Sequence, residues 1–127
     1  MSENQKKIWI TGASSGIGKA VAEKFAAEGW KVAVSARRKE LLQDMAKDQN
    51  ISSFPLDVTD RSQINNVFQN ILKEFGNIDV CLFSSGTYEP KDEQNIDPDK
   101  IKNVINVNFL GVIDCVKTCL LYTSDAA

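Results

Sequence analysis

The residues best suited to chemistry are three glycines near the N-terminus, Gly12, Gly16 and Gly18, in the spacing G-x-x-x-G-x-G. They follow a short β-branched segment and lead directly into an amphipathic helix pattern. Glycine allows a tight turn and lets a ligand approach where a Cβ would clash. A helix start offers free N–H groups and a partial positive charge, which together attract an anion. The spacing therefore predicts a phosphate-binding turn, with a purely structural turn as the alternative.

A P-loop is the nearest rival for this turn, and the sequence excludes it at two positions. Counted from Gly18-Lys19, a P-loop needs glycine at Ala13 and serine or threonine at Ala20. The spacing also differs from the G-x-G-x-x-G fingerprint of many nucleotide-binding turns. The residues expected to hold the phosphates are Gly12, Ser14, Ser15, Gly16, Ile17 and Gly18.

Length and composition set bounds on the class of protein. The chain has 127 residues, enough for one domain, with 43% hydrophobic and 25% charged residues, as is ordinary for a globular protein. A net charge of −2 gives no electrostatic footprint for nucleic acid. The polar N-terminus does not resemble a signal peptide, and no apolar run suggests a membrane span. We therefore expect a cytoplasmic protein that contacts neither membrane nor nucleic acid.

The metal-binding side chains are few and poorly spaced. Histidine is absent, and the three cysteines, Cys81, Cys115 and Cys119, form no C-x-x-C pair. Two thiols one helical turn apart make a poor metal site by themselves. We expect no metal, and buried, reduced thiols.

Apolar segments alternate with helical patterns along the chain, which predicts βαβ units and a parallel sheet. The first expected helix has an apolar face formed by Ile17, Val21 and Phe25. A polar loop is expected from residue 87 to 97. The expected strands are 7–11, 30–35, 51–56 and 78–84; the expected helices are 16–28, 38–47, one through 64–75, and one opening at Pro98.

In this order of elements, Thr11 to Gly18 resembles the T-G-x-x-x-G-x-G turn of the short-chain dehydrogenase/reductase family. The resemblance covers residues 6 to 118. It implies an α/β fold with a Rossmann-type doubly wound parallel sheet, incomplete here, with about four strands in the order 3-2-1-4 and helices on both faces. It also implies an oxidoreductase that transfers a hydride between a nicotinamide cofactor and a carbonyl or alcohol.

The residues after the second strand indicate the type of cofactor. NAD-dependent enzymes place an acidic residue there for the ribose hydroxyls, whereas arginine accommodates a 2′-phosphate. This chain has Arg37, Arg38 and Lys39, and no acid before Glu40. Cations at a helix start oppose the helix dipole, so propensity does not explain them. NADP(H) is therefore favoured over NAD(H), with Arg37 as the main partner and Arg38 beside it.

Asp57-Val58 follows the third strand, where the family keeps an aspartate whose side chain meets the adenine amino group. The resemblance thus places Asp57 and Val58 at the adenine. A role for Asp57 in a turn or a helix cap, with Thr59 or Asp60, is the alternative and is compatible with the first.

After the fourth strand the family usually carries Asn-Asn-Ala-Gly, and this chain has Phe83-Ser84-Ser85-Gly86. Only the glycine is kept. The resemblance places Ser85 and Gly86 beside the nicotinamide ribose. The loss of both asparagines removes side chains that could donate hydrogen bonds there.

An asparagine interrupts the apolar positions expected on the last helix. Because this asparagine lies on the same side of the helix as the apolar residues, its amide should be buried and require hydrogen-bond partners. The stripe consists of Ile101, Ile105, Asn108 and Val112. The run from Val107 to Gly111 resembles the family's Val-Asn-x-x-Gly helix, whose asparagine belongs to the catalytic tetrad and orders a water in a proton relay. The resemblance makes Asn108 the catalytic candidate; a structural buried asparagine is the alternative.

The family's catalytic Ser and Tyr-x-x-x-Lys do not occur in the 127 residues. Tyr88 is followed at that spacing by Asp92, and Tyr122 by Ala126. In the family the tyrosine is general acid/base, the lysine lowers its pKa and the serine orients the carbonyl. We expect an N-terminal fragment that is inactive by itself, the activity belonging to a parent enzyme.

The last nine residues, 119–127, are similar to an in-frame translation of the transposon-end adapter used in sequencing-library preparation. On this interpretation, residues 1–118 form a partial NAD(P)-binding Rossmann domain and residues 119–127 a non-native tail, which should be left out of fold reasoning. A natural helix end with a small polar tail is the alternative.

Two other functions fit parts of the sequence. A non-catalytic NAD(P)-binding sensor or partner-binding module is favoured by Phe83-Ser84-Ser85-Gly86. A flavodoxin-like or receiver-type domain would need an acidic cluster after Thr11, which is lacking. The expected partners are a small carbonyl or alcohol substrate and, for the parent, further copies of itself.

Overall fold

The computed structural model describes residues 5–87 and 96–126, with side chains up to residue 122. Tyr88 and most of the loop expected at 87–97 lie outside the described residues. The strands are β1 (Lys7–Thr11), β2 (Lys31–Ser35), β3 (Ile51–Ser53) and β4 (Val80–Phe83). The helices are α1 (Gly16–Ala27), α2 (Lys39–Met45), α3 (Arg61–Phe75), α4 (Pro98–Ile105), a π-helical turn η2 (Asn106–Leu110) and α5 (Gly111–Ala126).

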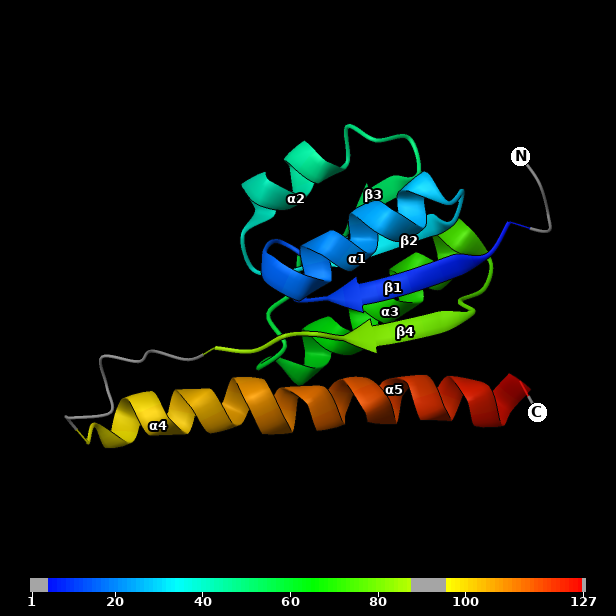
Figure 1. The fold of residues 1–127 in the computed structure, drawn as a ribbon. Coiled ribbons are helices and arrows are strands. Elements are labelled where there is room, and N and C mark those ends of the chain that lie inside the picture. The colour runs from blue at the N-terminus through cyan, green and yellow to red at the C-terminus, as the bar shows by residue number, and fades with distance from the viewer. Residues whose placement is uncertain (1–4, 88–95, 127) are drawn as a thin grey trace.

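The four strands form one parallel sheet in the order β3-β2-β1-β4, as predicted (Figure 1). The strand that starts the chain is thus central. Thr11 at the end of β1 lies opposite Ser35 on β2 and Phe83 on β4. Because the strands are parallel and in this register, their carboxyl ends meet at one edge of the sheet.

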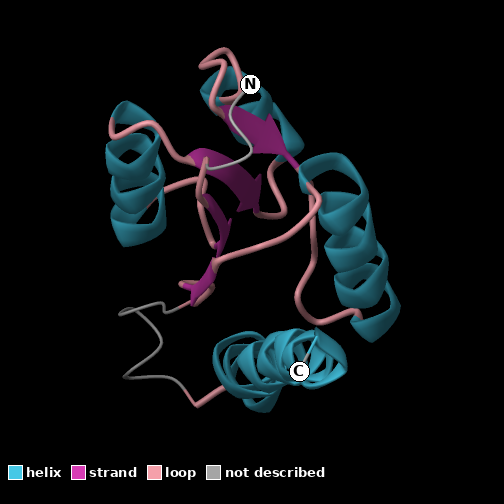
Figure 2. Cartoon of the chain, turned by 90° about the vertical axis from the view of Figure 1, so that its right-hand side faces the viewer, coloured by secondary structure: helices cyan, strands magenta, loops and turns pink. Residues whose placement is uncertain are grey.

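Helices cover both faces of the sheet, which confirms the doubly wound fold class (Figure 2). Ile8 and Ile10 of β1 point to one face, packed among residues of α1 and α2. Trp9 points to the other face, packed among residues of α3 and the last helix. This second core, here called the α3-side core, contains Trp9, Ala33, Leu56, Val58, Ile64, Phe68, Ile71, Phe75, Val107 and Cys115.

The face predicted for α1 is wrong in part. Ile17 is 75% exposed, and the fully buried positions are Gly18, Ala22 and Ala26. Small residues allow the helix to approach the sheet closely, so the tightest contact falls on the side with the least side-chain volume. Helix α3 matches its prediction, with Gly76 in a left-handed conformation (φ 87°) directly after its last residue.

Helix α4 opens at Pro98, as predicted, and Asp97 accepts a hydrogen bond from the Asp99 backbone N–H. The helix continues without a break through η2 into α5 (Figure 1). A π-helical turn adds a residue to the turn and so rotates the positions that follow it. The apolar stripe predicted through Ile101 and Ile105 is wrong: both residues precede this turn and are 48% exposed, and Val107 and Cys115 are buried instead.

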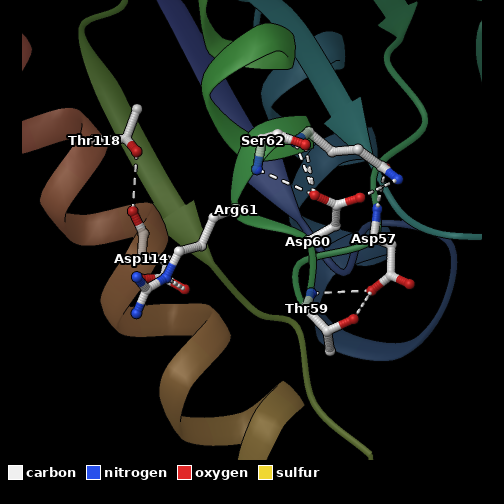
Figure 3. Close-up of polar contacts among 8 residues, drawn as sticks. Asp57, Thr59, Asp60, Arg61, Ser62, Asp114 and Thr118 are labelled. Atoms are coloured by element: carbon white, nitrogen blue, oxygen red, sulfur yellow. Dashed lines mark hydrogen bonds and ion pairs between the residues drawn. The ribbon is translucent and has the colours of Figure 1, made fainter.

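By length and composition alone, the segment Pro98–Tyr122 could cross a membrane. It has 25 residues and a mean hydropathy of 1.6 over its most apolar window, of which 17% is buried. The expectation that no apolar segment reaches this length is corrected, since α4, η2 and α5 join. In the structure this helix packs along the sheet, and Asp114 pairs with Arg61 of α3 at 3.2 Å (Figure 3).

Asp60 caps the N-terminus of α3, and its carboxylate is a pH-sensitive part of the fold. Its Oδ1 accepts hydrogen bonds from the Ser62 hydroxyl at 2.7 Å and the Ser62 backbone N–H at 3.1 Å (Figure 3). These bonds, with those from Gln63, hold the pKa of Asp60 below its ordinary value of 3.8. A lowered pKa means that the cap stabilises the fold above 3.8 and is lost as pH falls further.

We therefore predict that acid lowers the thermal midpoint of the wild-type chain more than that of Asp60→Asn. Asparagine caps helices about as well as aspartate but does not titrate in this range. The measurement is the unfolding midpoint followed by circular dichroism, from neutral pH to below 3.8. Identical pH profiles of the two proteins would contradict the assignment of the acid sensitivity to this carboxylate.

Candidate functional site

A cavity of about 490 Å³ lies at the carboxyl ends of the strands. This volume falls within the range of small-molecule and cofactor sites, roughly 300–1,000 Å³. Four segments converge on it: the glycine turn after β1 and the segments after β2, β3 and β4. Among the predicted binding residues, the cavity is lined by Gly12, Ser14, Ser15, Gly16, Ile17, Arg37, Arg38, Asp57, Val58, Ser85 and Gly86.

The glycine turn is packed so closely that side chains would not fit at two of its positions. A Cβ on Gly12, whose φ is 65°, would lie 2.6 Å from the Ser84 carbonyl carbon and 2.7 Å from Ser85 Cα. A Cβ on Gly18 would overlap the Gly12 carbonyl. Gly18 therefore does not line the cavity but lets α1 start directly on the turn, which brings the helix N-terminus to the cavity.

Gly16 completes the turn in a different way. Its φ is 56°, and a Cβ there would meet no heavy atom within 4 Å. The left-handed conformation favours glycine, and the space above the residue is open. The turn thus presents free backbone to the cavity, as a cradle for phosphate groups requires.

The segment after β2 supplies the positive charge of the site. Arg37 and Arg38 line the cavity, whereas Lys39, the first residue of α2, is not among its lining residues. Arg38 occupies the N-cap position of α2 without a side-chain capping bond. Two guanidinium groups beside a helix start and a glycine turn make this end of the cavity suited to an anion.

Asp57 forms a local turn and also faces the cavity. Its Oδ1 accepts hydrogen bonds from the Thr59 backbone N–H at 2.9 Å and the Thr59 hydroxyl at 2.6 Å (Figure 3). Its own backbone N–H donates to Gln63 Oε1 at 3.1 Å. The turn role therefore occupies one carboxylate oxygen and orients the other. Among the described residues, none donates a hydrogen bond to Oδ2, so it is available to a ligand.

Asn108 is held by the segment after β4, although it is not buried as predicted. Its side chain is exposed, because the π-helical turn places Val107 rather than Asn108 against the sheet. Its Oδ1 accepts from the Thr87 N–H at 2.6 Å, and its Nδ2 donates to the Thr87 carbonyl at 2.8 Å. Both ends of the amide are satisfied, and they anchor the backbone that follows Gly86.

Several residues that line the cavity were not singled out from the sequence. Leu41 of α2 is one, and the apolar pattern of that helix contained a signal for it: Leu42 and Met45 fill the core, which leaves Leu41 facing outward. Each of the remaining lining residues is adjacent in sequence to a predicted residue, and this position in the backbone explains why it lines the cavity. They are Ala36, Leu56, Ser84, Thr87 and Val107.

The cysteines are free thiols that lie away from the cavity, and the expectation that all three are buried is wrong for two of them, because Cys81 and Cys119 are half-buried. Cys115 is buried in the α3-side core, and burial raises the pKa of its thiol to about 12. Cys81 Sγ and Cys119 Sγ lie 3.2 Å apart in a hydrogen bond, which lowers the pKa of Cys81. Among the described residues, no three metal-binding side chains form a cluster.

Comparison with known proteins gives one consistent result. The family model described as short chain dehydrogenase matches residues 6–126. A mouse protein named dehydrogenase/reductase SDR family member 7 is 32% identical over 123 residues, which cover 90% of this chain and 36% of the relative. The chain thus spans about a third of this relative, and activity, substrates and partners of a whole protein go beyond this comparison.

Solved structures agree with the fold. ElxO with NADP bound superposes with a TM-score of 0.87 at 30% identity, covering 96% of this chain and 52% of that one. A short chain dehydrogenase from Bacillus anthracis gives a TM-score of 0.89 at 27% identity, with 95% and 52% covered. The fold described above is therefore shared with solved chains of about twice this length.

Proposed function

This chain belongs to the short-chain dehydrogenase family of oxidoreductases, and on that premise we propose that it is the cofactor-binding part of an NADP(H)-dependent enzyme. The parent enzyme transfers a hydride between the nicotinamide and a carbonyl or alcohol carbon of a small molecule. The observation that carries the proposal is the convergence of the glycine turn and two arginines on one cavity. ElxO, similar to this chain, has been solved with NADP bound.

The residues fit such a cofactor along the length of the cavity. The glycine turn and the start of α1 hold the pyrophosphate, because Gly12 and Gly18 leave no side chain in its way. Arg37 meets the 2′-phosphate, assisted by Arg38. Asp57 accepts a hydrogen bond from the adenine amino group through its free Oδ2, with Val58 against the ring.

The segment after β4 borders the reacting end of the cofactor. Ser85 and Gly86 lie beside the nicotinamide ribose, and Asn108 holds this segment through Thr87. In the proposed enzyme Asn108 is the catalytic candidate because it matches the asparagine of the family's Val-Asn-x-x-Gly helix, which orders a water of the proton relay. When bound, the nicotinamide supplies or accepts the hydride. This chain's residues bind it and fix its orientation.

Binding of the two cofactor types tests the proposal. We expect the chain to bind NADPH at least about tenfold more tightly than NADH, because one charge-assisted arginine–phosphate contact contributes roughly 1.5–3 kcal/mol. Arg37→Ala should remove most of this preference while leaving the Kd for NADH within about twofold. Lys39→Ala is the matched control, a cation of the same run that does not line the cavity. The measurement is isothermal titration calorimetry with each cofactor.

Three outcomes decide against parts of this function. Equal affinity for NADPH and NADH would contradict the NADP(H) assignment, and no binding of either would contradict a cofactor site. A parent protein that binds NADPH but oxidises none with any carbonyl substrate would favour the alternative, a non-catalytic NAD(P)-binding sensor or partner-binding module. The altered segment Phe83-Ser84-Ser85-Gly86 is the feature that supports this alternative.

We propose a cytoplasmic parent that forms a homo-oligomer and contacts neither nucleic acid nor membrane. A net charge of −2 argues against nucleic acid. The packing of Val107 and Cys115 on the sheet argues against a membrane role for the last helix. The apolar face which that helix exposes, with Ile105 and Phe109, supports contact with another copy.

A further inference from the structure

One layer of side chains lies under the strand ends that border the cavity. Trp9 of β1 donates a hydrogen bond from Nε1 to Ser35 Oγ at the end of β2, at 2.9 Å. Both residues are 0% exposed. The indole also packs edge-on against Phe83 at the end of β4, with ring centroids 6.0 Å apart. A single side chain therefore contacts the ends of both strands that flank β1.

Ser35 connects this layer to the two loops above it. Its carbonyl oxygen accepts a hydrogen bond from the Ala13 N–H of the glycine turn at 3.1 Å. The next carbonyl, that of Ala36, accepts from the Leu56 N–H at 3.0 Å. Arg37 follows directly in the sequence and lines the cavity. The position of Ser35 therefore sets where the backbone of Arg37 stands relative to the glycine turn.

The two parts of the site share the bonds of Ser35 but differ in their other contacts. The glycine turn is fixed by backbone packing, since Gly12 lies against Ser84 and Gly18 against Gly12. The segment of Arg37 is held by the backbone hydrogen bonds of Ser35 and Ala36 and by the packing of Ala36 against the core on the α1 face of the sheet. An indole N–H that fixes a buried hydroxyl under this segment therefore acts more on the arginine than on the turn.

We propose that Trp9 is a positioning residue for cofactor selectivity: by holding Ser35, it places Arg37 at the distance from the glycine turn that a 2′-phosphate requires. This inference rests on the proposed function of the cavity. Trp9 contacts no cofactor itself. Its effect reaches the ligand through Ser35 and the backbone of Ala36.

The test compares two ligands that differ by the 2′-phosphate, 2′,5′-ADP and 5′-AMP, by calorimetry on the full chain. Trp9→Phe keeps a ring to pack against Phe83 but removes the N–H. It should reduce the preference for 2′,5′-ADP roughly fivefold, the usual scale of one buried hydrogen bond. Ser35→Ala should give the same reduction, and the double variant should add nothing further.

Trp30→Phe is the matched control. Trp30 packs against Phe25 on the opposite face of the sheet and makes no contact with the strand-end layer. The Trp30→Phe variant should leave the preference for 2′,5′-ADP over 5′-AMP unchanged. Circular dichroism and the thermal midpoint establish that each variant is folded, and Ser35→Ala tests the same bond if Trp9→Phe does not fold.

The outcomes separate the inference from the function on which it rests. If the wild-type chain shows no preference for 2′,5′-ADP, the assignment of the 2′-phosphate site fails, and the role of Trp9 with it. If the wild-type preference is present and both variants keep it, the positioning role alone is overturned. Equal weakening of both ligands would indicate a structural role of Trp9 and would also overturn the proposal.

Discussion

Gly12→Ala is expected to lower the affinity for NADPH at least about 100-fold and to destabilise the fold. The new Cβ would lie 2.6 Å from the Ser84 carbonyl carbon, so either the glycine turn or the segment after β4 must move. The left-handed backbone adds a strain of about 1–2 kcal/mol for any residue with a Cβ. Calorimetric titration with NADPH and the thermal midpoint measure the two effects.

A substitution at a second glycine distinguishes the effect of the steric clash with Ser84 from the effect of the backbone strain. Gly29 also has a left-handed backbone, with φ 88°, but a Cβ there would meet no heavy atom within 4 Å. Gly29→Ala should therefore lose about 1 kcal/mol of stability and keep its NADPH affinity. If Gly12→Ala bound NADPH as well as Gly29→Ala, the close approach of the turn to Ser84 would not matter for the cofactor.

Phe68→Ala is expected to cost about 3–5 kcal/mol in the free energy of unfolding. Phe68 is 2% exposed and lies at the centre of the α3-side core. Its ring packs against Trp9 and Tyr122, with centroids 5.7 and 5.5 Å away. Domains of this size are stable by about 5–15 kcal/mol, so the loss is a large share of the total. Urea unfolding at equilibrium gives the value.

Phe109→Ala provides the control for a phenylalanine outside this core. Phe109 is 61% exposed on the last helix, so its truncation should change the unfolding free energy by no more than about 0.5 kcal/mol. A loss of less than 1 kcal/mol from Phe68→Ala would mean that α3 and the last helix do not pack on the sheet as described.

The local parts of the site could be predicted from the sequence because each depends on a few adjacent residues. The glycine spacing from Gly12 to Gly18 identified a turn whose packing the structure shows. The cations at Arg37 and Arg38 follow a strand, and parallel strands bring their carboxyl ends to one edge. The cofactor roles of these residues stay predictions until binding is measured.

The parts that failed are features that helical and strand periodicity does not encode. Asn108 was expected inside because helical periodicity was continued through η2, and nothing in the local sequence marks a π-helical turn. Ile17 is grouped by periodicity with the apolar face of α1, but it borders the cavity, which agrees with its other prediction as a residue of the glycine turn. The bond from Trp9 to Ser35 spans 26 residues, and periodicity carries no information about such a pair.

The central place of β1 in the sheet has a consequence for how the chain assembles. Lys7 of β1 pairs with Lys31, 24 positions later, while Ile8 pairs with Val80, 72 positions later. Closing the longer loop costs only about 1 kcal/mol more in chain entropy, because that cost grows with the logarithm of loop length. The connectivity that brings β4 to the cavity therefore lowers the free energy of unfolding only slightly. The consequence is kinetic: the side of the cavity formed by the segment after β4 depends on the most distant strand pairing in the sheet, and distant pairings form slowly.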